Sequence, residues 1–90
     1  MVVNYFVDFS QEAATSLSRL DKQIAQRILD RIKWLSFHIE DVNHKALSGH
    51  LRGAFKLRVG DYRVVYELKH KTAVMTIRLI AHRSEVYYRR

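Results

Sequence analysis

The sequence predicts an α+β fold: an N-terminal strand, two antiparallel helices, a three-stranded antiparallel sheet and a short C-terminal turn or helix. Two patterns carry this prediction. Apolar residues recur at helical spacing between positions 13 and 39, which is typical of helices with one buried face. Residues 55–80 mostly alternate apolar and polar side chains, which is typical of strands that bury one face of a sheet. A chain of 90 residues has the length of one domain, and we assign 1–90 to a single domain.

The first half of the chain is expected to form one strand and two helices. Residues 2–9 alternate imperfectly and predict a strand, and Ser10 is a suitable N-cap for the helix that follows. One continuous helix over the apolar pattern would be about 43 Å long at 1.5 Å per residue. That length exceeds what a domain with a radius of gyration of roughly 12 Å accommodates. We therefore expect a break at Asp21, another good N-cap, with helices over 11–20 and 22–38.

A β-hairpin is the clearest local feature of the second half, and it follows a loop predicted over 40–53. Gly60-Asp61 lies between two alternating runs, and glycine readily adopts the backbone angles that a two-residue hairpin turn needs. This turn predicts that Phe55 pairs with Tyr66 and Arg58 with Arg63.

A third strand is predicted over 73–80 after a turn at 69–72. An even loop length would place Arg63 opposite Arg78 and Tyr66 opposite Met75. The apolar face would then gain Ala73, Met75, Ile77 and Leu79. The other face would become a basic floor of Lys56, Arg58, Arg63 and Arg78. Arginines that face each other repel, and a bound anion would turn the repulsion into attraction.

Charge is distributed unevenly along the chain. Residues 1–44 carry five Lys/Arg against six Asp/Glu, whereas residues 45–90 carry eleven against three. A basic half on a balanced domain points to a polyanion such as nucleic acid, or to an acidic protein. The chain has no cysteine, which suits the reducing cytoplasm where we expect the protein to act. No apolar run approaches the ~20 residues that cross a bilayer, and the N-terminus does not resemble a secretory signal, so no membrane partner is expected.

The segment LRGAFKLRVGDYRVVYEL at 51–68, followed by a hydrophobic strand and IAHRSEVY at 80–87, closely resembles the RelE/ParE toxin superfamily, and in particular its RelE-like branch. The resemblance covers nearly the whole chain. It implies the toxin of a type II toxin-antitoxin system, a ribosome-dependent endoribonuclease that cleaves messenger RNA in the A site and inhibits translation. It also implies a cognate, RelB-like antitoxin as partner, with DNA contacted only indirectly through that antitoxin.

The resemblance also implies a set of site residues. Catalysis in the branch is attributed to basic residues of the sheet, an arginine near the C-terminus and a tyrosine just after it. Carried onto this chain, these positions are Lys56, Arg58, Arg63, Arg83 and Tyr87. Further candidates for RNA binding are Arg52, Arg78 and His82. Some members have lysine where Arg58 stands.

Cleavage of RNA without a metal uses the ribose 2′-hydroxyl as nucleophile, a group that takes its proton, positive charge for the transition state and an acid for the leaving oxygen. Neither paired histidines nor cysteines with metal-ligand spacing are present, so no metal or other cofactor is expected. We expect Arg63 and Arg83 to hold the phosphate, because guanidinium groups match its oxygens bidentately. Lys56 is a candidate base or electrostatic stabiliser, and Tyr87 a candidate for base stacking and proton transfer. Arg58 cannot be the base, since guanidinium stays protonated.

Three alternatives stay open at this stage. The basic residues can be simply the solvated side of an antiparallel sheet. The chain can be a ParE-like toxin that inhibits DNA gyrase without a catalytic cluster. It can also be a module that binds RNA or antitoxin without chemistry, for which arginine in place of lysine at Arg58 is the motivating feature.

Overall fold

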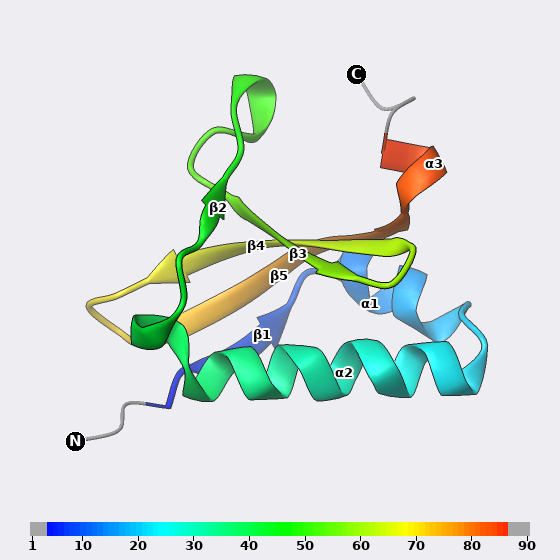
Figure 1. Cartoon of the computed structure of the whole chain (residues 1–90), viewed down its shortest axis with the longest axis horizontal. Helices are drawn as coiled ribbons and strands as arrows, with labels where there is room; N and C mark the ends of the chain where they lie inside the picture. The colour runs from blue at the N-terminus through cyan, green and yellow to red at the C-terminus, as the bar shows by residue number, and fades with distance from the viewer. Residues whose placement is uncertain (1–3, 87–90) are drawn as a thin grey trace.

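The computed structural model describes residues 4–86 and confirms the α+β class (Figure 1). The elements are, in chain order, β1 (Phe6–Phe9), α1 (Gln11–Ser18), α2 (Lys22–Phe37), η1 (Ile39–Asp41), β2 (Lys45–Ala46), η2 (Gly49–Leu51), β3 (Phe55–Val59), β4 (Tyr62–Lys69), β5 (Val74–His82) and α3 (Arg83–Val86). None of the helices in this described part is both long and apolar enough to span a membrane.

The sheet has five strands instead of the three that the sequence predicts. Its order is β1-β5-β4-β3-β2, with β1 parallel to β5 and the other neighbours antiparallel. Strand β1 was expected, but its alternation does not reveal that it pairs with a strand almost seventy positions away, Phe6 with Val74. Strand β2 lies within the segment predicted as loop and is only two residues long. Both additions widen the sheet at its edges.

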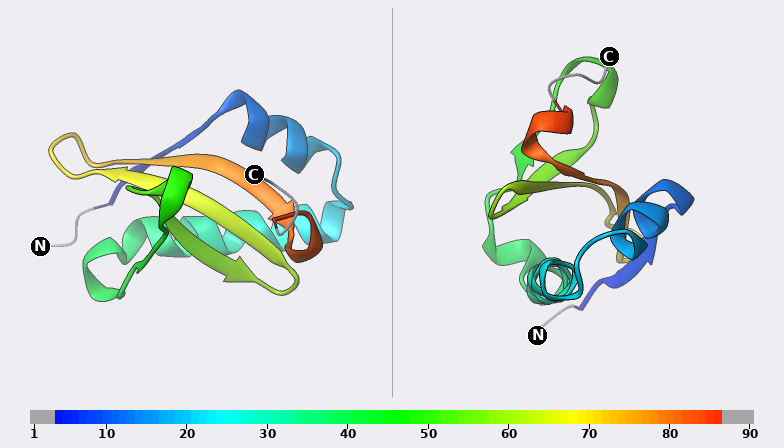
Figure 2. Two further views of the ribbon diagram at one scale, coloured as in Figure 1. Left: turned by 90° about the horizontal axis from the view of Figure 1, so that it is seen from above. Right: turned by 90° about the vertical axis from the view of Figure 1, so that its right-hand side faces the viewer.

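The two helices cover one face of the sheet, and their predicted starts are confirmed. The Ser10 hydroxyl accepts the Ala13 N–H at 3.1 Å, and the Asp21 carboxylate accepts the Gln23 N–H at 3.1 Å. After the break, α2 returns beneath the sheet in roughly the opposite direction to α1 (Figure 2). Helix α1 packs mainly on β5, whereas α2 lies against β1 and β3, so each helix is held mainly by the sheet.

The main core lies between the helices and the sheet. Its largest fully buried side chains are Ile28, Ile32, Leu35, Val64, Tyr66, Met75 and Ile77. Burial of this apolar face is the main favourable term for a fold of this size. Helices α1 and α2 leave the opposite face of the sheet uncovered, which makes that face available for a functional site.

The register of β5 differs from the predicted one. Arg63 pairs with Ala81 and Tyr66 with Ile77, so neither predicted pairing, with Arg78 or with Met75, is correct. The loop occupies residues 70–73, and a β-bulge then inserts Arg78 between the pairs Val65–Leu79 and Tyr66–Ile77. Because the bulge shifts the alternation, Leu79 joins a small cluster on the open face instead of the main core.

Two segments rise from the open face of the sheet (Figures 1 and 2). One is the arm, which we define as residues 43–54 and which includes β2 and η2. The other is α3, at the end of β5. Together they flank the open face on the side opposite the helices.

Candidate functional site

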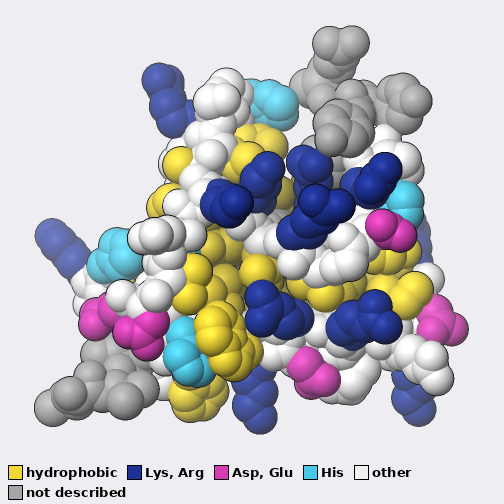
Figure 3. Space-filling view, in the orientation of Figure 1, with side chains coloured by type: hydrophobic (Ala, Val, Ile, Leu, Met, Phe, Trp, Pro, Cys, Tyr) yellow, Lys and Arg dark blue, Asp and Glu magenta, His cyan; other side chains and the backbone are white. Residues whose placement is uncertain are grey.

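The open face of β2, β3 and β4 carries a row of cations that we call the cationic face: Lys45, Lys56, Arg58 and Arg63. The ladder pairs Lys45 with Lys56, and Arg58 with Arg63. The predicted hairpin register is therefore confirmed, with Gly60 at φ +58° in the turn. Directly paired side chains lie on the same face of a sheet, so like charges meet twice along this surface. Figure 3 shows Lys and Arg side chains gathered in this region, between the arm and α3.

An apolar strip lies beside these cations on the open face. Ala54, Val65, Leu79 and Ala81 form a second buried cluster, against which Leu47 packs. Two of these residues, Leu47 and Ala54, belong to the arm. The Leu47 N–H donates to the Ala54 carbonyl at 3.0 Å, so the arm folds back on itself. The strip gives the arm an anchor on the sheet, so the cationic face has a fixed wall beside it.

Arg83 lies at the hairpin end of the same face. Its N–H donates to the Asp61 carbonyl at 2.7 Å, which continues the β4–β5 register past the pair Tyr62–His82. Because Asp61 is two residues from Arg63, the two backbones are separated by about 7 Å along the strand direction. Arg83 also opens α3, which rises on the open side of the sheet (Figure 1). This placement brings Arg83 near Arg63, whereas Tyr87 lies outside the described residues.

The sequence predicts Arg78 on the same face as Lys56, Arg58 and Arg63, and this prediction is wrong. Arg78 is the inserted residue of the bulge and pairs with Glu67, with 3.5 Å between its Nη1 and the carboxylate. Glu67 lies four residues along β4 from Arg63, which is about 13 Å in a strand. Arg78 is thus partly neutralised by a carboxylate that lies toward the end of β4 away from the hairpin turn.

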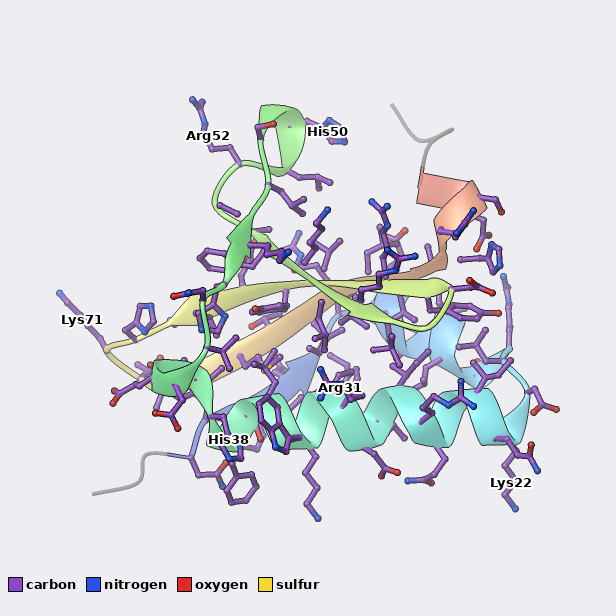
Figure 4. The ribbon with its side chains drawn as sticks, in the orientation of Figure 1. Lys22, Arg31, His38, His50, Arg52 and Lys71 are labelled. Atoms are coloured by element: carbon purple, nitrogen blue, oxygen red, sulfur yellow. The ribbon has the colours of Figure 1, made fainter. Side chains whose placement is uncertain are left out.

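The structure separates the other two predicted RNA-binding residues from the cationic face. Arg52 lies near the tip of the arm and points away from the sheet (Figure 4). His82 alternates with Ala81 and therefore turns to the other side of β5, where its ring meets Tyr62 edge-on at 5.3 Å. Its Nδ1 accepts the Ser84 N–H at 3.2 Å, which makes His82 a cap for α3.

A groove runs between the outer edge of β3 and α2, and we call it the β3 groove. Its volume is about 320 Å³. Its lining residues are Arg31, Leu35, Val42, Asn43, Lys45, Lys56, Leu57, Arg58, Arg63 and Tyr66. The groove is continuous with the cationic face, because four residues line both. Arg31 and Lys45 were not identified from the sequence, since a helix surface residue and a lysine in a polar loop give no local signal.

A histidine–tyrosine pair fixes the base of the arm. His44 Nδ1 lies 2.6 Å from the Tyr66 hydroxyl, and His44 Nε2 lies 2.7 Å from the Ile39 carbonyl. Since a carbonyl only accepts, Nε2 donates to Ile39, and the Tyr66 hydroxyl is the partner of Nδ1. Burial raises the pKa of the Tyr66 phenol from 10.0 to about 12, because the phenolate would lose its hydration. This pair fixes the residue before Lys45, which lies beside β3 and pairs with Lys56.

The chain was compared with known protein families and solved structures. The sequence model of the family described as the ParE toxin of type II toxin-antitoxin systems matches residues 7–87. Comparison with curated proteins found no match.

Solved structures of toxins share the fold. The RelBE2 toxin-antitoxin complex of Mycobacterium tuberculosis matches with a TM-score of 0.81 and 28% identity, over 93% of this chain and 97% of that chain. The RelE-RelB complex of Pyrococcus horikoshii matches with a TM-score of 0.71 and 27% identity, over 89% and 96%. A mutant of the free RelE toxin of Escherichia coli has a TM-score of 0.74 at 21% identity, over 97% and 92%, and shows the fold alone.

Proposed function

The chain belongs to the RelE/ParE superfamily of toxins of type II toxin-antitoxin systems, and we propose that it is an endoribonuclease that cleaves messenger RNA in the ribosomal A site and so inhibits translation. The observation that carries the proposal is the cationic face. Four cations face the open side of the sheet, two of them as the directly opposed pair Arg58 and Arg63. Such a surface favours a bound phosphate over an empty state.

The proposed reaction is a transfer within the RNA. The 2′-hydroxyl oxygen attacks the adjacent phosphorus, the new O2′–P bond forms and the P–O5′ bond breaks. The products are a 2′,3′-cyclic phosphate and a 5′-hydroxyl. The 2′ proton goes to a base and the leaving 5′ oxygen receives a proton from an acid. The atoms balance without a metal ion or a water molecule.

We assign roles by position and chemistry. Arg63 and Arg83 hold the non-bridging oxygens of the phosphate, with Arg58 adding positive charge at the same link. Lys56 lies two residue pairs further along β3, on the same face, and is the candidate for proton transfer within the described residues. Tyr87, which only the family resemblance brings to the site, is proposed to stack on a substrate base.

The partner follows from the family and from the charge. The solved relatives from M. tuberculosis and P. horikoshii are toxins in complex with their antitoxins. We propose a RelB-like antitoxin with an acidic or amphipathic segment that covers the basic half of this chain. In this proposal the antitoxin makes the contacts with DNA, and the toxin contacts DNA only indirectly. The toxin acts in the cytoplasm, where ribosomes translate.

A gyrase inhibitor is the second candidate, because the matching family model is that of ParE toxins. The discriminating experiment adds the purified chain to a translation reaction and to a DNA gyrase supercoiling assay. The endoribonuclease proposal expects new transcript ends by primer extension and unchanged supercoiling. Intact transcripts with blocked supercoiling would refute it. If the chain neither cut transcripts nor blocked supercoiling, it would be a binding module without chemistry.

A further inference from the structure

The outer edge of β3 is open where it borders α2. Strand β2 pairs with β3 only through Lys45–Lys56 and Ala46–Phe55. Beyond those pairs, no described strand lies beside residues 57–59 on the side of β3 away from β4, and the β3 groove borders that side. The proposed cleavage assigns no role to the part of the groove nearest α2.

The lining of the groove combines positive charge with an apolar floor. Five cations line it, and none of its ten lining residues is acidic. Val42 and Leu57 supply partly exposed apolar surface, and the buried side chains of Leu35 and Tyr66 complete the lining. A nucleotide has the matching properties, a flat base with an apolar face and an anionic phosphate. The volume of about 320 Å³ is at the small end of the ~300–1,000 Å³ typical of ligand sites, which suits one nucleotide better than a long segment.

Arg31, which lines the groove, lies over one aromatic ring, and a second ring stacks on that one. Its guanidinium carbon lies 5.2 Å from the centroid of the Trp34 ring, a cation–π contact. The other ring in the stack is His38, 4.1 Å from Trp34 with 12° between the planes. His38 Nδ1 is fixed in turn at 2.7 Å from the Trp34 carbonyl. Figure 4 shows Arg31 extending from α2 toward the sheet. A side chain ordered in advance loses less entropy when it binds an anion.

We propose that the β3 groove is a subsite for the nucleotide next to the cleaved link, with its base on the apolar floor and its phosphate between Arg31 and Lys45. The inference rests on the proposed function, since it takes RNA as the substrate. The four cations of the cationic face also line the groove, so an RNA strand bound at that face reaches the groove along a continuous positive surface. Arg31 is then a substrate-binding residue on helix α2, outside the sheet that carries the cationic face.

The test measures binding without cleavage. A fluorescein-labelled, 2′-O-methylated oligonucleotide cannot react, and its anisotropy reports binding to the purified chain. Arg31→Gln and Lys45→Gln should each weaken binding, and the double variant should reduce the slope of log K against log salt by about 0.7, the value for one phosphate on a single strand. Lys33→Gln is the matched control, because Lys33 is exposed on the same helix but does not line the groove.

Trp34 provides a second readout, since it is the only tryptophan of the chain. Its emission should change saturably on addition of the oligonucleotide and stay unchanged with a glutamate-rich peptide. A response to the peptide alone would make the groove a protein-binding site and overturn the proposal. Equal binding and equal salt slopes for Arg31→Gln, Lys45→Gln and Lys33→Gln would also overturn it. These outcomes do not depend on cleavage, so they are separable from a failure of the endoribonuclease assignment.

Discussion

Arg58 and Arg63 oppose each other directly across the β3–β4 ladder, on the face of the sheet that the helices leave uncovered. Lys56 lies two pairs further along this ladder, and Lys45 pairs with it. Like charges in this arrangement destabilise a sheet. The phosphate of the proposed RNA substrate would reduce this repulsion, and the free protein should show its effect on stability.

Replacement of Arg58 should stabilise the free protein. Arg58→Gln removes one partner of the repulsive pair and should raise the free energy of unfolding by about 0.2–1 kcal/mol at low salt. The gain should shrink in 1 M salt, where the Debye length falls to about 3 Å. Urea unfolding at both salt concentrations measures it. Lys69→Gln is the control, because Lys69 pairs with the uncharged Val74. Equal effects of the two substitutions would contradict the repulsion.

The buried phenol of Tyr66 should make folding sensitive to alkaline pH. Its pKa is raised to about 12 in the folded chain, so the native state keeps a proton that the unfolded state loses above pH 10. The stabilisation is complete below pH 10 and is lost as the pH rises toward 12. Within that window this group lowers the free energy of unfolding by about 1.4 kcal/mol per pH unit.

Tyr66→Phe isolates this contribution. The variant should be less stable at pH 8, because His44 loses its 2.6 Å hydrogen bond, but its stability should fall less steeply above pH 10. Urea unfolding between pH 8 and 11 gives both curves. Parallel curves for the two proteins would show that the phenol is not the titrating group.

Ala73 should tolerate glycine with a gain in stability. It has φ +55° in the loop between β4 and β5, a left-handed conformation that costs an L-residue roughly 1–2 kcal/mol. Glycine adopts this conformation at little cost, so Ala73→Gly should raise the melting temperature. Ala14→Gly is the opposite control, since Ala14 is exposed within α1 and should lose roughly 0.5–1 kcal/mol. A loss of stability at both positions would exclude strain at Ala73.

The sequence predicted the parts of the fold that depend on neighbouring residues. Gly60-Asp61 set the β3–β4 register, and Ser10 and Asp21 set the helix starts. The bulge at Arg78 was not predictable, because alternation continues on both sides and only packing against β4 reveals the extra residue. Parallel pairing of β1 with β5 depends on contacts remote in sequence, which no local pattern encodes.

The candidate site divides in the same way. Lys56, Arg58 and Arg63 share a face because the hairpin register is local. Arg78 and His82 were displaced by the bulge and by alternation after it. Arg31 and Lys45 join the β3 groove only through the tertiary packing of α2 and the arm. The candidate binding residues outside the hairpin could therefore be identified only from the structure.

The most direct test of the central claim is the single-turnover cleavage rate of a ribosome-bound transcript with Arg63→Ala and Arg78→Ala. Arg63 lies on the cationic face, whereas Arg78 lies on the same sheet but pairs with Glu67. The account predicts a loss of about 10²–10³-fold for Arg63→Ala, typical of one electrostatic contact in a transition state, and little change for Arg78→Ala. A transcript with a 2′-O-methyl group at the mapped link should resist the wild-type chain. Full activity of a folded Arg63→Ala variant, or cleavage of the methylated link, would contradict it.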